Sequence, residues 1–283
     1  MKLPISVIIL TLNEEQNIAC CLDSVKGWAG EIFVVDSGST DRTVEIARGY
    51  TEKIVSHPFT NYAHQRNWAQ NHLPLAYDWV FHLDAGEQVT LELAAALGSK
   101  FAGPPLPVDG FLINRRAIFM GRWIKHGGIY PTYHLRLYRR AKGHCEEREY
   151  DQHFKIEGAV ATLPGDIIDE IAPDLNSWTL SHARWASAEA AEQLKQRQPQ
   201  PAAPDQVQGR LFGTAIERRR WLRQSVYGRA PLFVRPFAYF IYRYVLRLGF
   251  LDGVEGFIFH FLQGFWYRFY VDAQIWEWRK NVE

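Results

Sequence analysis

The sequence predicts an α/β fold built on a mixed, mainly parallel sheet that is flanked by helices, with a helical appendage at the C-terminus. Two observations predict it. Apolar, β-branched runs alternate with segments of helical spacing through the first hundred residues, as in a sheet whose strands are joined by right-handed crossovers. The last quarter of the chain is far richer in aromatic residues than the rest.

The strand-like runs of the first half are short and bounded by polar turns. "ISVIIL" (5–10) is continuously apolar, which is typical of a strand buried on both faces. Further strands are expected at 31–36, 53–59 and 79–84, helices at 14–25 and 62–73, and a turn leading to a helix, capped at Ser39 or Thr40, within 37–47.

The second half is less regular. "AGPPLPVDG" (102–110) interrupts the chain, "GFLINRRAIF" and "YHLRLYRR" are expected to be strands, and 177–197 a helix. A Pro/Gln-rich linker is expected at 198–209, so the predicted boundaries are a domain over 1–197, with halves 1–100 and 101–197, and a helical region over 210–283.

Composition excludes several classes of protein. The net charge of +1 offers no general field for nucleic acid, and neither GxGxxG nor GxxxxGK[ST] is present. Three cysteines without metal spacing, two of them adjacent, indicate a reduced, cytoplasmic chain.

The C-terminal region suits a membrane surface. Of 40 Phe, Trp and Tyr residues, 19 lie within 221–283, and eight arginines but no acid lie within 218–247. Arg243 and Arg247 interrupt the first long apolar run, and Glu255 and Arg268 the second, so neither is a clean membrane span. Basic residues beside aromatic belts favour a helix in the membrane interface over the alternative, a helical hairpin packed on the main domain.

Polar side chains follow three of the predicted strands. The first ends in Thr11-Leu12-Asn13-Glu14, the second in Asp36 and the fourth in Asp84. Because ligands of open parallel sheets bind at the carboxyl ends of the strands, these residues predict one acidic crevice. Such acids suit ribose hydroxyls, a base N–H or a metal that bridges phosphates. The alternative is that Asp36 and Asp41 only cap a turn and a helix.

Four motifs in order resemble a known family. "SVIILTLNEEQNIACCLDSV", "EIFVVDSGSTDRTVEIA", "AHQRNWA" and "WVFHLDAGE" are similar to the family-2 inverting glycosyltransferases with a GT-A fold, in particular to bacterial enzymes that build lipopolysaccharide core, capsule or exopolysaccharide. The tail "YRYVLRLGFLDGVEGFIFHFLQGFWYRFYVDA" resembles that subgroup too. The resemblance makes 1–100 the nucleotide-sugar half and 101–197 the acceptor half.

The resemblance implies a donor site. Asp36 matches the family's pyrimidine-binding Asp, which favours UDP as carrier. The other implied nucleotide-sugar contacts are Thr11, Asn13, Glu14, Arg66, Asn67 and Asp84.

Gly86 departs from the family's Asp-x-Asp motif, in which the second Asp is usually the direct ligand of Mg²⁺ or Mn²⁺. Asp84 with Glu87 is the remaining metal candidate, or phosphate oxygens and water supply most of the ligands, as Mg²⁺ tolerates. Alternatively, a nearby cation among Arg66, Arg136 and Arg139 neutralises the diphosphate.

The resemblance also implies a catalytic base near "YDQHF". Gln152 cannot act as a base, so Asp151 is the first candidate and Glu149 the second. Trp123 and His126 are expected to line the acceptor site.

The predicted function is inverting transfer of a hexose-type sugar from a nucleotide sugar to a lipid-linked saccharide, lipopolysaccharide or exopolysaccharide. The enzyme is expected in the cytoplasm, peripheral on the inner face of the cell membrane. The alternative is a non-catalytic nucleotide-sugar-binding or scaffold protein, favoured only by Gly86 and Gln152.

Overall fold

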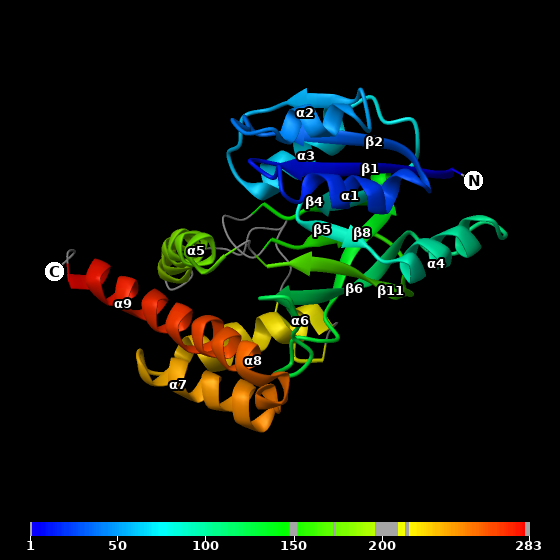
Figure 1. Cartoon of the computed structure of the whole chain (residues 1–283). Coiled ribbons are helices and arrows are strands. Elements are labelled where there is room, and N and C mark those ends of the chain that lie inside the picture. The colour runs from blue at the N-terminus through cyan, green and yellow to red at the C-terminus, as the bar shows by residue number, and fades with distance from the viewer. Residues whose placement is uncertain (1, 148–151, 172–173, 196–208, 213–214, 281–283) are drawn as a thin grey trace. The chain divides into compact units, whose positions relative to one another are not determined.

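The computed structural model describes residues 2–147, 152–171, 174–195, 209–212 and 215–280 (Figure 1). The chain divides into two compact units. The first comprises Met1–Ile118, Pro131–Glu146 and Gln152–Ile171, and the second Phe119–Tyr130, Glu147–Asp151 and Ala172–Glu283. The expected linker at 198–209 lies almost wholly outside the described residues.

A mixed, curled sheet forms the centre of the first unit, in the strand order β3-β2-β1-β4-β8-β6-β11-β5. The four strands from β3 to β4 are parallel, β8 runs antiparallel to both β4 and β6, and β11 is parallel to β6. The bounds are β1 (Leu3–Thr11), β2 (Ala29–Asp36), β3 (Ile54–Ser56), β4 (Trp79–Asp84), β5 (Glu87–Val89), β6 (Gly110–Phe119), β8 (Tyr133–Arg139) and β11 (Val160–Glu170).

β1 is buried on both faces, as its unbroken apolar run predicts. Ile5, Val7 and Ile9 join one core cluster with α1 (Ile18–Lys26), α2 (Thr43–Arg48) and α4 (Leu91–Phe101). Ile8 and Leu10 join the other cluster, with α3 (Tyr62–His72). Two apolar layers therefore hold the parallel half of the sheet rigid.

The strands predicted in the first half are confirmed, and so are those at 110–119 and 133–140. Several elements were not predicted. They are α4, β5, β11 and the hairpin of β9 (Gly143–Cys145) with β10 (Phe154–Ile156), preceded by the short turn η1 (Arg140–Lys142).

The second unit is helical, with α5 (Leu175–Lys195) packed on α9 (Tyr267–Lys280). Ala186 and Ala190 of α5 meet Tyr267, Val271 and Ile275 of α9. The remaining elements are β7 (Arg122–Trp123), α6 (Ala215–Trp221), η2 (Leu222–Val226), η3 (Tyr227–Arg229), α7 (Val234–Ile241), η4 (Tyr242–Leu246), η5 (Gly249–Asp252), α8 (Gly253–Phe259) and η6 (His260–Trp266).

Part of the arginine-rich segment is neutralised by acids that are distant in sequence. Arg235 forms a buried ion pair with Asp272, and Arg223 lies 2.7 Å from the carboxylate of Glu189. The expectation that these arginines lack acidic partners is wrong for both residues. Local sequence could not reveal it, because the partners lie on other helices.

Replacing Phe81 of β4 should strongly destabilise the first unit. Phe81 is fully buried and packs edge-on against Trp28, with ring centroids 5.8 Å apart. We expect Phe81→Ala to lower the free energy of unfolding by about 3–5 kcal/mol, because it leaves a cavity. Urea unfolding followed by circular dichroism measures the change. Phe212→Ala is the matched control, since Phe212 is 97% exposed; similar losses in both variants would contradict the packing described.

Candidate functional site

Strand register brings the predicted polar residues to one edge of the sheet. β1 lies between β2 and β4, with Thr11 opposite Asp36 and Leu10 opposite Asp84. Asp36 and Asp84 therefore stand at the carboxyl ends of the two strands that flank β1. The hydroxyl of Thr11 is buried there and has no hydrogen-bond partner among the described residues.

The loops that follow β1 and β2 are joined by hydrogen bonds. Asn13 adopts a left-handed backbone conformation (φ 54°), which asparagine tolerates better than most residues. Its side-chain oxygen accepts from the Thr40 amide at 2.8 Å, and its own amide donates to the Ser39 hydroxyl at 2.9 Å. The amide of Glu14 donates to the Thr43 hydroxyl at 2.7 Å. The two loops thus form one preorganised edge.

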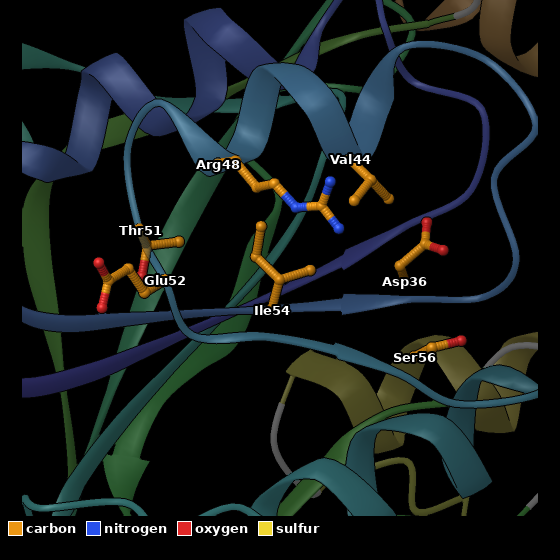
Figure 2. Close-up of a pocket in the computed structure, with 7 residues that line it drawn as sticks. All are labelled: Asp36, Val44, Arg48, Thr51, Glu52, Ile54 and Ser56. Atoms are coloured by element: carbon orange, nitrogen blue, oxygen red, sulfur yellow. The ribbon is translucent and has the colours of Figure 1, made fainter.

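Asp36 organises its own loop and also faces a pocket. Its carboxylate accepts from the amides of Gly38 and Ser39 at 3.0 Å, and from the Ser39 hydroxyl. The turn-forming alternative is therefore part of what Asp36 does. Figure 2 shows its carboxylate at one end of an open pocket, with Arg48 and Ile54 between it and Glu52 at the other end. Oδ2 accepts from two amides, whereas Oδ1 accepts from the Ser39 hydroxyl and only weakly from the Ser39 amide, at 3.3 Å, so a further donor would bind at Oδ1.

Asp84 is held by an arginine from α3. Arg66 Nη2 donates to both carboxylate oxygens of Asp84, at 2.8 and 2.9 Å. The guanidinium group of Arg66 is itself positioned by the ring of Phe154, whose centroid lies 5.2 Å away. The Asp84 side chain is 36% exposed, more than the other members of this cluster, so the cluster opens to solvent on that side.

Glu87 and Arg136 form a second, more deeply buried pair beside the first. Arg136 Nη2 on β8 donates to Glu87 Oε1 at 2.5 Å, and Glu87 Oε2 accepts from the Asp84 amide at 3.0 Å. Arg136 Nη1 also lies 3.6 Å from Asp84 Oδ2. Arg66, Asp84, Glu87 and Arg136 are called the four-charge cluster below.

The surroundings of the two carboxylates separate their pKa values. Loss of water contact would raise the pKa of Asp84, but the guanidinium groups of Arg66 and Arg136 outweigh it and lower that pKa to about 2. Burial and the neighbouring Asp84 carboxylate raise the pKa of Glu87, while the guanidinium group of Arg136 opposes that rise. Asp84 consequently stays ionised at neutral pH and keeps its ion pair with Arg66.

The four-charge cluster does not fit a divalent cation held by protein carboxylates. Both oxygens of Asp84 accept from Arg66, and both oxygens of Glu87 accept hydrogen bonds as well. Gly86 contributes no side-chain ligand. Within the described ranges, no group of three or more His, Cys, Asp and Glu side chains is arranged to hold a metal. Mg²⁺ and Mn²⁺ need several oxygen ligands, so a cation here would take most of them from the donor phosphates and water and few from these side chains.

Two predicted site residues have other partners. Asn67 donates to the Cys145 carbonyl at 2.8 Å and accepts from the Cys145 amide at 2.9 Å, so it fastens α3 to β9. Arg139 lies opposite Trp79 at the far end of β4 from Asp84, and its Nε is 3.5 Å from Asp109. The structure does not bring Arg139 together with the four-charge cluster.

The acceptor candidates belong to the second unit. Trp123 packs edge-on against Tyr130, with ring centroids 5.0 Å apart. His126 Nδ1 lies 2.7 Å from Oδ1 of the buried Asp252. The other oxygen of Asp252, Oδ2, accepts from the backbone amide of His126 at 2.8 Å. The base candidates Glu149 and Asp151 lie outside the described residues.

Sequence reasoning missed a buried pair near those base candidates. Glu146 is fully buried and accepts from the His153 amide at 2.9 Å, with His153 Nδ1 3.2 Å away. The only signal was that both stand in the acid-dense segment 145–158. In the sequence, Glu146 stands among other acids and is expected to be solvated. The structure shows that it is buried and paired with His153 across the β9–β10 hairpin.

Comparison with known proteins agrees with the geometry. Residues 6–144 match the model of glycosyl transferase family 2. The chain is 32% identical over 165 residues to the lipopolysaccharide core biosynthesis glycosyltransferase LpsC of Rhizobium meliloti, covering 56% of this chain and 58% of that protein. It is 39% identical over 98 residues to an uncharacterized glycosyltransferase of Rickettsia typhi, covering 35% and 33%. The chain thus spans about a third to three fifths of these curated relatives.

Among solved structures, residues 1–349 of Staphylococcus aureus TarS in complex with UDP-GlcNAc align over 99% of this chain and 92% of that one, at 15% identity and a TM-score of 0.45. The mixed, mainly parallel sheet with flanking helices is GT-A-like, as the four motifs predict. Residues 6–144 of the chain therefore form a glycosyl transferase family 2 domain.

Proposed function

We propose that the protein is an inverting glycosyltransferase that moves a hexose-type sugar from a UDP-sugar to a lipid-linked saccharide or lipopolysaccharide-type acceptor at a membrane surface. The observation that carries the proposal is the meeting of Thr11, Asp36 and Asp84 at adjoining strand ends. The name of the Rhizobium relative supports the class of acceptor.

The donor site suits a nucleoside diphosphate along its length. Asp36 presents a carboxylate to the pocket in Figure 2, where it can accept a base N–H. The unpartnered Thr11 hydroxyl and the loop of Asn13 and Glu14 lie next to it, within reach of ribose hydroxyls. The four-charge cluster follows at the end of β4, where the phosphates would lie.

The reaction is one in-line displacement. The base removes the proton of the acceptor hydroxyl as its oxygen attacks the anomeric carbon. The bond from that carbon to the diphosphate oxygen breaks, and its electron pair leaves with the nucleoside diphosphate. Configuration at the anomeric carbon inverts because a single displacement occurs. Asp151, with Glu149 as second candidate, is proposed as the base from its place in the sequence.

A membrane-facing surface of the second unit would bring the enzyme to its acceptor. Exposed apolar side chains recur at helical spacing along 234–248 and again along 251–261. α7 and η6 lie against each other, with the rings of Phe237 and Phe265 4.5 Å apart. We call this set the apolar face: Val234, Phe237, Ile241, Val245, Leu248, Leu251, Val254, Phe257 and Phe261.

Several charged side chains of the second unit are buried, although Arg247 is exposed. Arg235, Arg243, Asp252 and Asp272 are all buried. Arg235 pairs with Asp272, while Arg243 donates to the Gly127 carbonyl at 2.8 Å. A helix pair in water normally has the opposite arrangement, with charges outside.

The proposed occupant of the apolar face is the surface of a lipid bilayer. No helix within the described parts of the chain is both long and apolar enough to cross a membrane. Exposed Arg247, beside the apolar face, suits anionic headgroups, while the aromatic side chains suit the headgroup boundary.

Asp36→Asn should weaken UDP binding by about tenfold, because a charge-assisted hydrogen bond to the base is lost. Isothermal titration with UDP measures the affinity. Ser39→Ala is the matched control, since it removes a loop hydrogen bond to Asp36 but keeps the carboxylate. If both variants lose affinity equally, loop order and not base recognition explains the effect.

Asp151→Ala should reduce sugar transfer by about a hundredfold or more while UDP binding stays unchanged, because a general base acts only on the acceptor. Transfer to detergent-solubilised acceptor lipid, with donor hydrolysis measured in parallel, tests this. Full activity in Asp151→Ala combined with loss in Glu149→Ala would move the assignment to Glu149. An unaltered rate in both would remove it from this segment.

The double variant Phe237→Ser, Phe257→Ser should bind vesicles of phosphatidylethanolamine and phosphatidylglycerol about tenfold more weakly than the natural chain, because apolar area is lost from the interface. Vesicle sedimentation measures the partition. Leu91→Ser is the matched control, since Leu91 is an exposed apolar residue of α4. Equal partition of the double variant and the natural chain, with circular dichroism unchanged, would reject the apolar face as the membrane contact.

A further inference from the structure

We infer that Arg66 and Arg136 bind the donor diphosphate in place of a divalent cation held by the protein, with Asp84 and Glu87 as positioning residues for the two guanidinium groups. The inference rests on the proposed nucleotide-sugar donor. It assigns the acids of "DAGE" a role other than metal ligation.

The carboxylates of the four-charge cluster already have hydrogen-bond partners. Asp84 directs both oxygens at one nitrogen of Arg66, and Glu87 divides its oxygens between Arg136 and the Asp84 amide. The nearest acid of the β1 loop, Glu14, accepts from Asn17 at 2.7 Å. A cation bound here would have to displace the arginines from these acids, at the cost of leaving two buried guanidinium groups unpaired.

Each arginine of the cluster has a buried N–H group that donates no hydrogen bond to another described residue. Arg66 Nε and Arg136 Nη1 are buried and have no hydrogen-bond partner among the described residues. The Arg136 side chain is only 8% exposed. Buried donors are normally satisfied, and an unsatisfied one is costly. A ligand rich in acceptor oxygens would satisfy them, and arginine forks match phosphate oxygens in particular.

The position of the four-charge cluster in the fold also suits a diphosphate. The four-charge cluster draws on α3, β4, β5 and β8, so its groups stand on regular elements and not on loops (Figure 1). It is most exposed at Asp84, which flanks the end of β1 opposite Asp36. We place the base of the nucleotide at Asp36 and its phosphates at the cluster, because both stand at the carboxyl ends of strands that flank β1.

The two arginines also suit the charge that develops on the leaving diphosphate. When the glycosidic bond breaks, the electron pair stays on the diphosphate, which gains one negative charge relative to the intact donor. A guanidinium group remains protonated at every relevant pH, so two of them neutralise this charge without any proton transfer. The acids keep both groups in place before the donor arrives, which spares reorganisation in the transition state.

The test is calorimetric binding of UDP, GDP and dTDP to metal-stripped protein, in EDTA and in excess Mg²⁺ or Mn²⁺. We expect the tightest of the three nucleotides to bind with affinities that differ by less than about twofold between the two conditions. Arg66→Lys and Arg136→Lys should each weaken that nucleotide about tenfold, because lysine cannot make the forked contact. The corresponding nucleoside, which has no phosphates, should bind both variants as it binds the natural chain.

Two controls keep the result interpretable. Arg139→Lys changes an arginine on the same strand that pairs with Asp109 away from the cluster, and it should leave nucleotide binding unchanged. The double variant Glu87→Gln, Arg136→Gln removes both charges of the buried pair together. It tests the role of Arg136 without leaving Glu87 as an unpaired buried charge.

The possible failures are distinguishable. If the nucleotide binds only when Mg²⁺ or Mn²⁺ is present, the inference is overturned while the proposed donor class stands. If nucleotide affinity is the same with and without metal, and is also unchanged in both arginine variants, the inference is overturned and the diphosphate lies elsewhere. If none of the three nucleotides binds under either condition, the proposed function fails, and the inference fails with it.

Discussion

The pairing of β1 with β2 on one side and β4 on the other determines where the polar side chains of the site can lie. The register sets Thr11 against Asp36 and Leu10 against Asp84. A slip by one residue would turn each carboxylate to the opposite face of the sheet. The register is secure because β1 is apolar on both faces, so either slip would exchange its two sets of buried side chains between different cores.

The charged side chains at the end of β4 can be buried only because two arginines there neutralise two acids. An isolated carboxylate there would be neutralised or excluded. Arg66 and Arg136 come from a helix and a strand distant from Asp84 in sequence, so the cluster also connects the parallel half of the sheet to the mixed half. A group that holds two halves of a sheet together couples the stability of the fold to the geometry of this sheet edge.

The sequence was informative where the signal is local. The run 79–84 predicts β4, and the acid at its end predicts a strand-end residue with a role beyond the turn. β5 was missed because it has three residues and joins the far edge of the sheet, beside β11. Arg136 and Arg139 could not be ranked from the sequence, since both follow apolar residues of one strand. Only the antiparallel pairing of β8 with β4 shows that they lie at different distances from Asp84.

Long-range partners also escaped prediction in the helical unit. A window of eight arginines without an acid looks unbalanced, yet Asp272 and Glu189 compensate two of them from other helices. The inward placement of charge leaves an outward apolar surface, which the composition of 210–283 predicts only in part. Spacing identifies amphipathic helices, but it does not show which side of each helix the tertiary structure covers.

Gly86 carries a consequence for how this motif can change over generations. No atom lies within 4 Å of the position that a Cβ would occupy, and the backbone there is not left-handed. The backbone therefore does not require glycine at this position, and a Cβ would fit there. One base change turns any glycine codon into an acidic one: GGY becomes GAY, which encodes aspartate, and GGA or GGG becomes a codon for glutamate. An acid at this position is therefore one mutational step away.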